Sequence, residues 1–236
     1  MNKKELVVKY RPLVRLACGV HNLSNALRIK KHGGGNRIIA PCALLKKLRV
    51  QFSGSNNTLI VEDFSILKGV SIYVSGDNNV IRIGSWCHLL DTEFCMEEAG
   101  NTITIGERSR LLGRTHLAAM EGTHIRIGRE CLFSSDIHFR TGDSHSVLDM
   151  EGRRINPSGD IDIGDHVWVG TKVTCLKGAK VPPHSIVGAC ALVTKQFDEP
   201  NCALAGVPAR VVKRGVDWSI QRIPMGETAP DFQQIT

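Results

Sequence analysis

The stretch from Ile163 to Thr194 constrains the fold of this 236-residue chain more than any other, because it repeats every six residues. The repeats open on apolar residues, at Ile163, Val169, Cys175, Val181, Val187 and Val193. Their fifth places hold smaller residues, at Val167, Val173, Ala179, Ser185 and Ala191. A six-residue period fits neither a helix nor an isolated strand, but it fits short strands that turn corners and stack. The pattern therefore predicts an all-β fold, a parallel β-helix with a narrow lumen.

A longer repeat precedes the six-residue units. An apolar position recurs every 22 residues, at Ile39, Val61, Ile83, Ile105 and Ile127. Asparagine-containing segments before most of these positions tolerate tight turns, so we interpret each coil as three six-residue sides plus about four residues of corner loop. Cys87 and Cys131 stand where neighbouring coils have small residues, and we expect them to be buried core residues rather than nucleophiles or metal ligands.

The composition agrees with a narrow core and limits the partners. Aromatic residues make up only 5% of the chain, which suits a lumen filled by aliphatic side chains. The net charge of +7 favours anionic partners, but the basic residues are spread along the chain without the aromatic–basic array that binds nucleic acid. No run of 18 apolar residues, signal-peptide core or C-x-x-C pair occurs. We therefore expect a reducing, cytoplasmic setting and no nucleic-acid partner.

The chain divides into three parts. Residues 1–35 have apolar residues at helical spacing, with Pro12 in a first turn or at a break, and are expected to form a helical cap on the solenoid. The alternative is a basic helix that touches a membrane surface or a partner. Residues 36–200 form the β-helix, and residues 201–236 form a C-terminal segment. Its last part, 220–236, is expected to be an extended or poorly ordered tail.

The repeat is interrupted once. Ile127 and Ile163 are 36 residues apart, so this coil holds either an insertion of 14 residues or two turns of which one is irregular. The residues responsible, about 138–160, are polar and rich in turn-forming residues, histidines and carboxylates. Long excursions from a regular scaffold commonly carry function.

Several segments together resemble the hexapeptide-repeat family of left-handed β-helix acyltransferases, and within it the sugar and polysaccharide O-acetyltransferases. These segments are Thr141–Ser146, Gly152–Asn156, Ile163–Gly170, Val187–Ala189 and Ala205–Arg210. The resemblance is close from about Ile127 to Arg214, looser over the earlier coils and absent from residues 1–35. The left-handed crossover follows from the resemblance alone, because parallel crossovers are otherwise nearly always right-handed.

The resemblance implies a homotrimer that binds acetyl-CoA in the groove between adjacent subunits. The residues it implies for acetyl-CoA are Trp168, Gly170, Ala189, Lys195, Ala205, Arg210 and Lys213. Trp168 is expected to point outward beside the inserted loop, as a wall against the ligand or as a trimer contact. The basic residues either contact the CoA phosphates or form a solvated end of the solenoid.

The resemblance also implies that His145 is the catalytic base. Transfer from a thioester to a hydroxyl needs a group that removes the hydroxyl proton, and histidine is suited to this near neutral pH. His145 follows Asp143 in a Gly-bounded loop, and the Asp143 carboxylate is a candidate to fix its tautomer. His166 and His184 occupy outward places of the hexads and are expected to be exposed.

His116, His138 and Arg140 are candidates for acceptor binding. The two histidines are 22 residues apart and are expected to lie on neighbouring coils, where packing is the simplest alternative role. A zinc site formed by His116, His138 and His145 would resemble γ-class carbonic anhydrases, although the spacing does not match that family well. We expect no metal. The expected function is acetyl-CoA-dependent O-acetylation of a sugar or glycan hydroxyl; the alternatives are N-acetylation of a nucleotide amino sugar, a zinc-binding protein or a non-catalytic scaffold.

Overall fold

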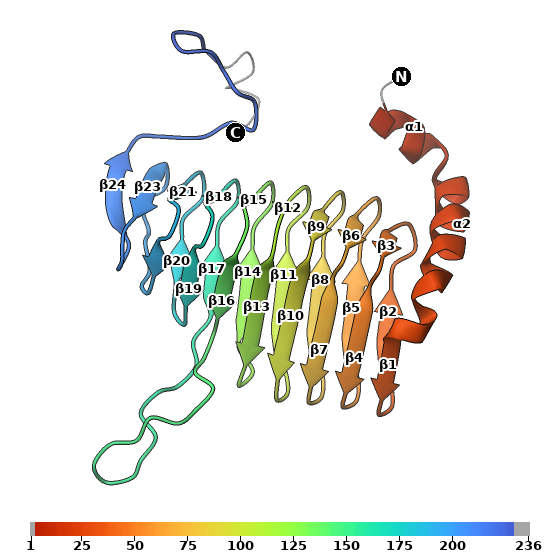
Figure 1. Ribbon diagram of the computed structural model, residues 1–236, viewed down its shortest axis with the longest axis horizontal. Coiled ribbons are helices and arrows are strands. Elements are labelled where there is room, and N and C mark those ends of the chain that lie inside the picture. Colours follow the sequence, from red (N-terminus) through yellow and green to blue (C-terminus); the bar gives the residue numbers. More distant parts are fainter. Residues whose placement is uncertain (1–2, 229–236) are drawn as a thin grey trace.

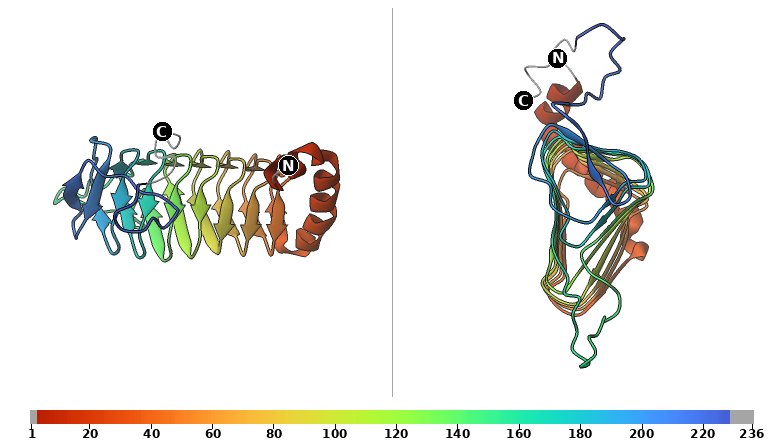
Figure 2. Two further views of the ribbon diagram at one scale, coloured as in Figure 1. Left: turned by 90° about the horizontal axis from the view of Figure 1, so that it is seen from above. Right: turned by 90° about the vertical axis from the view of Figure 1, so that its left-hand side faces the viewer.

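The computed structural model describes residues 3–228, which form a parallel β-helix with helices at its N-terminal end (Figure 1). Seen along its axis, the solenoid has a triangular cross-section (Figure 2). The predicted all-β solenoid is confirmed. No helix within residues 3–228 is long and apolar enough to cross a membrane.

Three sheets form the sides of the triangle, and every coil contributes about one strand to each. Sheet A consists of β1 (Ile29–His32), β4 (Arg49–Ser53), β7 (Ser71–Ser75), β10 (Thr92–Glu97), β13 (Thr115–Met120), β16 (Ile137–Arg140), β19 (Thr174–Leu176) and β22 (Leu192–Val193). Sheet B consists of β2 (Arg37–Ile39), β5 (Thr58–Val61), β8 (Val80–Ile83), β11 (Thr102–Ile105), β14 (His124–Ile127), β17 (Ile161–Ile163) and β20 (Lys180–Val181).

Sheet C is the third side. It consists of β3 (Leu44–Lys46), β6 (Ile66–Lys68), β9 (His88–Leu90), β12 (Arg110–Leu111), β15 (Leu132–Phe133), β18 (Trp168–Val169), β21 (Ile186–Val187), β23 (Cys202–Ala205) and β24 (Arg210–Arg214). All its neighbouring strands are parallel except β24, which returns antiparallel to β23. We call the three corners A/B, B/C and C/A after the sheets they join.

The repeat positions predicted from the sequence fill the lumen. The opening and fifth places of the hexads are buried, and so are Val61, Ile83, Ile105 and Ile127. Ile39 is an exception: it is 44% exposed and pairs with Ile60 instead of Val61. The first coil is one residue out of register here, so Ile38, which pairs with Leu59, and Ala40, which follows Ile39, pack against the core instead.

The buried cysteines are core residues, as expected. Cys87, Cys131 and Cys175 are each 1% exposed within the lumen. Burial raises the pKa of the Cys87 and Cys131 thiols to about 12 and also raises that of Cys175. A thiol that stays protonated at neutral pH is a poor nucleophile.

The A/B corner is where the coils differ in length. In the early coils this corner holds turns with left-handed Asn56 (φ 58°) and Asn78 (φ 57°). The coil from Ile163 to Val181 is shorter, at 18 residues, because its sheet A strand and its A/B turn are shorter. The inserted loop occupies the same corner: β16 pairs with β19 across a 36-residue offset, so the interruption is one coil with an insertion.

The N-terminal end is helical, with α1 (Lys3–Lys9), α2 (Arg11–Asn22) and the 3-10 helix η1 (Leu23–Arg28). Pro12 lies in the first turn of α2, where its missing amide hydrogen leaves no helical bond unmade. The helices stand across the open end of the solenoid (Figures 1 and 2). At the other end the chain continues past β24 without regular strands or helices, and the predicted tail residues 229–236 lie outside the described residues.

Candidate functional site

The inserted loop, residues 141–160, projects from the A/B corner as an arm (Figure 1). Its two sides are joined by an isolated antiparallel bridge between Leu148 and Arg154. The turn at the tip is closed by Asp149, whose carboxylate accepts bonds from the Arg153 amide and guanidinium, each at 2.9 Å. Met150 at this tip is fully exposed. The arm therefore keeps an internal structure while its outer end lies away from the solenoid.

Asn156 organises the base of the arm. Its side chain is 7% exposed, and its amide nitrogen donates to Asp143 Oδ2 at 2.8 Å and to the His145 carbonyl oxygen at 2.9 Å. Its amide oxygen accepts from the Val147 backbone nitrogen at 2.8 Å. The backbone on both sides of His145 is thus fixed by one buried amide, whose bonds across the loop the sequence did not indicate.

Glu121, on the coil before the arm, attaches the arm to the solenoid. The Glu121 carboxylate forms an ion pair with Arg154 and accepts a bond from the Ser158 backbone nitrogen at 3.1 Å. These bonds lower the pKa of Glu121 to about 2. The carboxylate is therefore ionised at neutral pH, when both bonds to the arm are fully formed.

The His145 side chain is exposed and makes no hydrogen bond or ion pair within residues 3–228. Asp143, expected to orient its ring, instead contacts Lys177 Nζ at 2.7 Å as well as Asn156. Lys177 and Asn156 both lower the pKa of Asp143. Within this chain Asp143 therefore supports the loop, and the imidazole of His145 is left free for an external partner.

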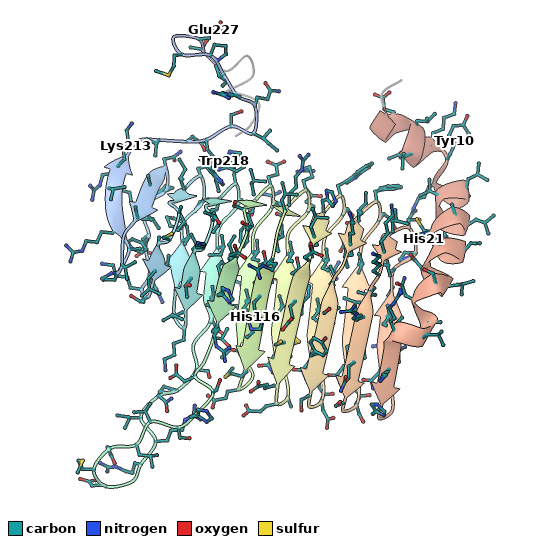
Figure 3. The ribbon with its side chains drawn as sticks, viewed as in Figure 1. Tyr10, His21, His116, Lys213, Trp218 and Glu227 are labelled. Atoms are coloured by element: carbon teal, nitrogen blue, oxygen red, sulfur yellow. The ribbon has the colours of Figure 1, made fainter. Side chains whose placement is uncertain are left out.

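His116 and His138 lie side by side on the outer face of sheet A, with ring centroids 5.8 Å apart. The Nδ1 atom of His116 is 3.3 Å from Glu93 Oε1, and burial lowers the pKa of His116 despite this carboxylate. A groove of about 470 Å³ surrounds them (Figure 3 labels His116), lined by Asp91, Glu93, Arg114, Thr115, His116, Asp136, Ile137, His138 and Lys172. Acidic and basic side chains both line this groove, so it offers hydrogen-bond acceptors and donors to a polar ligand.

Arg140 links this face to the arm. It lies two residues after His138 on β16, and its Nη2 atom donates to Ser144 Oγ at 2.8 Å. A strand rises about 3.3 Å per residue and alternates its faces, so His138 and Arg140 point to the same side roughly 7 Å apart. The three acceptor candidates and the start of the arm therefore share sheet A.

Most of the acetyl-CoA candidates gather on the neighbouring sheet C and its edge. A Cβ on Gly170 would lie 2.8 Å from the Ala189 backbone nitrogen, so the close stacking of these coils requires glycine there. Ala205 on β23 pairs with Arg210 on β24, and Lys213 lies further along β24, which is largely exposed. Lys195 follows β22 of sheet A, where its Nζ lies 5.3 Å from the centroid of the Phe197 ring.

Trp168 is 42% exposed, as expected, but it does not lie beside the inserted loop of its own chain. It begins β18 of sheet C at the B/C corner, whereas the loop leaves the A/B corner, and sheet B separates the two. The arm and the C-terminal tail leave opposite sides of the solenoid in Figures 1 and 2. The expected contact was wrong for a single chain, because one side of the prism lies between the corners.

Trp168 instead faces the tail, which the sequence did not place. Trp218 lies with its ring 6.2 Å from Trp168 and stacks on His166 at 4.5 Å and 12° (Figure 3). Its Nε1 atom donates to the His166 carbonyl oxygen at 2.9 Å. Asp217 contacts His166 at 3.4 Å and His184 at 3.1 Å. His166 is therefore buried, at 7% exposed, and the expectation that it is exposed was wrong because the tail covers it.

Metal-ligating residues group differently from the predicted zinc set. Among residues 3–228, the groups close enough to share an ion are Glu93–Cys95–His116 and His166–His184–Asp217. Neither group contains His145, which lies on the arm. The Cys95 thiol donates to Glu93 at 3.3 Å, and burial and this carboxylate raise its pKa to about 12, which opposes thiolate ligation. The arrangement gives no support to a site of the carbonic anhydrase type.

Comparisons with known proteins address the fold and the site together. The sequence matches no model of a protein family. It is similar to the solved structure of the polySia-specific acetyltransferase NeuO, with 31% identity over 85% of this chain and 91% of that chain and a TM-score of 0.76. The structure of the polysialic acid O-acetyltransferase OatWY is 27% identical over 88% of this chain and 99% of that chain, with a TM-score of 0.81.

A curated relative matches part of the chain with higher identity over a shorter length. The polysialic acid O-acetyltransferase of Escherichia coli O1:K1 / APEC is 36% identical over 98 residues, which is 41% of this chain and 31% of that protein. The chain thus matches less than a third of this relative's own length, whereas the two solved structures extend the likeness over nearly all coils. On the strength of this sequence and structural likeness, the chain belongs to the left-handed β-helix, hexapeptide-repeat acyltransferases, in their sugar O-acetyltransferase branch.

Proposed function

We propose that this protein transfers an acetyl group from acetyl-CoA to a hydroxyl of a carbohydrate. The observation that carries the proposal is the presentation of His145: an exposed imidazole with no partner within the described residues, on a loop that Asn156, Glu121 and Lys177 hold in place. The solenoid does not need this histidine for its own packing. The named relatives are polysialic acid O-acetyltransferases, which supports a glycan as the class of acceptor.

The acceptor would bind on the outer face of sheet A. His116, His138 and Arg140 offer hydrogen-bond donors and acceptors around the groove, and Arg140 adds a positive charge next to the arm. Carbohydrate hydroxyls need such polar groups for orientation. This assignment makes Glu93 a further acceptor-side residue, because it already orients the ring of His116.

The donor would bind along the C/A corner and sheet C. Acetyl-CoA supplies the acetyl group as a thioester. Gly170 and Ala189 leave the backbone accessible there, and the exposed cations of Arg210 and Lys213 suit the CoA phosphates. Lys195 follows β22 of sheet A, on a different side of the solenoid from Arg210 and Lys213, so it would reach the same phosphates only across the contact between two copies.

A homotrimer would bring the arm of one copy, with His145, next to the donor-binding residues of another copy. In one chain the arm with His145 leaves the A/B corner, whereas Trp168 begins sheet C at another corner, so His145 does not reach Trp168 of its own chain. An arm that extends away from its own solenoid can reach the side of a neighbouring copy. Cyclic assembly of three solenoids would repeat this contact three times.

In the reaction, His145 accepts the proton of the acceptor hydroxyl while the hydroxyl oxygen attacks the acetyl carbonyl carbon. A backbone amide donates to the developing oxyanion, and the CoA thiolate leaves and takes up a proton. Direct transfer is favoured over an acetyl-cysteine intermediate, because the raised pKa of Cys95, on the acceptor face, keeps it a thiol. A reducing, cytoplasmic compartment fits this proposal, since the eight cysteines are all unpaired.

The test is replacement of His145. His145→Ala is expected to lower kcat by about 10²–10⁴-fold, the usual contribution of a general base. Acetyl-CoA affinity, measured by calorimetry, should stay nearly the same because His145 acts on the acceptor hydroxyl and is not among the proposed donor-binding residues.

The matched control is His21→Ala, which removes an exposed histidine from the N-terminal helix. It should leave both quantities unchanged. Retention of activity within a few-fold in His145→Ala would remove His145 from the mechanism.

A further inference from the structure

The N-terminal helical cap is joined to the first coil of the solenoid by polar side chains. Asn22 and Asn25 bond the backbone of the first coil: Asn22 to Ala43 O and Leu45 N, each at 2.9 Å, and Asn25 to Leu45 O at 2.8 Å and Leu48 N at 2.9 Å. Two side-chain amides thus take the place of a neighbouring strand beside β3, the last strand of sheet C. Within the described part of the cap, the buried side chains are Cys18 and Asn25.

The apolar side chains of the cap lie on the opposite side, away from the solenoid. They form what we call the outer row: Leu13, Leu16, Val20, Leu23 and Leu27. These residues are between 63% and 96% exposed, and they follow one another at intervals of three and four residues. Leu13, Leu16 and Val20 lie on α2, where such spacing places side chains along one face of the helix, and Leu23 and Leu27 lie on the 3-10 helix η1 that follows it. The cap therefore buries its amides against the solenoid and leaves a row of apolar side chains exposed along α2 and η1.

Basic residues predominate in the part of the chain that carries the outer row, mostly before and after the row itself. Residues 5–31 contain one acidic residue, Glu5, against six basic residues: Lys9, Arg11, Arg15, Arg28, Lys30 and Lys31. Arg11 is paired with Asp63 at 2.6 Å, and the Lys9 ammonium lies 5.7 Å from the Tyr10 ring. An apolar helical face flanked by basic side chains is the combination that binds in the interface of an anionic bilayer.

We propose that the outer row and its basic flanks dock this protein, by the N-terminal end of the solenoid, on a membrane surface that contains anionic lipids. A second copy of the chain suits this face less well. Two such caps would bring their excess of basic residues together, and Ala17, Gly19, Ser24 and Ala26, which lie between the residues of the row, offer no acidic side chain to pair with them. Helices that pair in solution usually select one another through opposite charges beside the apolar contact.

End-on docking fixes the height of the candidate site. Sheet A runs from β1 beside the cap to β16 at the arm in five steps, β1–β4–β7–β10–β13–β16. Adjacent strands are about 4.8 Å apart, so the arm-bearing coil stands about 24 Å beyond the first coil, and the helix adds about 10 Å. If the proposed acceptor is attached to the membrane, its reacting sugar must extend roughly 30 Å from the bilayer. Binding to the membrane does not depend on the proposed chemistry.

Vesicle co-sedimentation of the full chain tests the docking. Binding is expected to vesicles of phosphatidylcholine with phosphatidylglycerol, and to fall steeply with phosphatidylcholine alone or at high salt. The double substitution Leu16→Ser/Leu23→Ser should lower the partition coefficient on the order of ten-fold or more, because two large apolar side chains no longer enter the interface. Arg15→Gln/Arg28→Gln should remove the preference for the anionic lipid.

The matched control is Val212→Ser/Ile220→Ser, which removes two apolar side chains that are 63% and 57% exposed at the other end of the chain. It should bind vesicles as the unchanged protein does, and all variants should melt at the same temperature because only exposed positions change. Equal binding by the leucine variant, or no binding to anionic vesicles, overturns the proposal. A smaller assembly in light scattering, caused by the leucine variant without any lipid binding, would assign the face to a second copy instead.

Discussion

The buried asparagines at the A/B corner bond successive coils to one another, in addition to lying in turns. Asn57, Asn79 and Asn101 are almost fully buried, and each side-chain oxygen that has a partner accepts from the next coil. Asn57 Oδ1 accepts from the Asn79 backbone nitrogen at 3.0 Å, and Asn79 Oδ1 from that of Asn101 at 2.9 Å. The turn signal in the sequence correctly marked these segments, but the bonds between coils appear only when the coils are stacked.

At this scale we predict that Asn79→Ala lowers the free energy of unfolding by about 1–3 kcal/mol, because it leaves a buried amide group of Asn101 without its acceptor. Urea denaturation followed by circular dichroism measures the change. Asn78→Gly is the control: Asn78 has a positive φ of 57°, which glycine adopts without strain, so its effect should be a few tenths of a kcal/mol. Equal losses in the two variants would show that the turn, and not the ladder, matters.

The inserted arm is held to the solenoid by side chains that lie outside it, which we call its anchors. Its polar sequence predicted an excursion, and the 36-residue offset between β16 and β19 selects an insertion within one coil over two turns of the solenoid. The anchors lie far away in the chain: Glu121 contacts Arg154 and Ser158, and Lys177 contacts Asp143. No periodicity relates these residues. The role of His145 stays a prediction that rests on the family resemblance and on its exposed, unpartnered ring.

The arm should loosen in acid. The pKa of Glu121 is lowered from 4.5 to about 2, so its stabilising contribution is complete above pH 4.5 and is lost as the pH falls towards 2. Hydrogen exchange of residues 147–158, corrected for intrinsic rates, should therefore rise over that range. Glu121→Gln should show the same rise already at neutral pH.

The control for this prediction is Glu151→Gln at the tip of the arm. Among the residues that the structure describes, the Glu151 carboxylate pairs with Arg153 alone, so its loss should leave exchange at the base unchanged. If Glu121→Gln exchanges like the unchanged protein, the ion pair with Arg154 does not hold the arm.

Within one chain, His145 on the arm lies apart from Trp168 on sheet C. The proposed trimer would bring His145 of one copy next to Trp168 of another. His145→Ala and Trp168→Ala should therefore each be weakly active alone. Co-expressed in equal amounts, they should regain activity at about a quarter of the sites, where an intact arm meets an intact sheet C from the next copy. Activity assays on the mixed, doubly tagged trimer measure this recovery.

Light scattering of the same sample should give the mass of three chains. Trp168→Ala mixed with a second sheet C variant, Arg210→Ala, is the control that should recover nothing, because both changes affect the same side of the site. Lack of recovery in the first mixture would place the complete site within one chain.

The sequence alone determined the solenoid, its coil lengths, the buried cysteines and the place where the repeat is interrupted. These features follow from a local rule, since each coil must present small or aliphatic residues to the same narrow lumen. Only the tertiary structure decided the register of Ile39, the burial of His166 beneath Trp218, the partners of Asp143 and the outward apolar face of the cap. Each depends on contacts between segments at different corners or ends of the solenoid, and such contacts leave no period in the sequence.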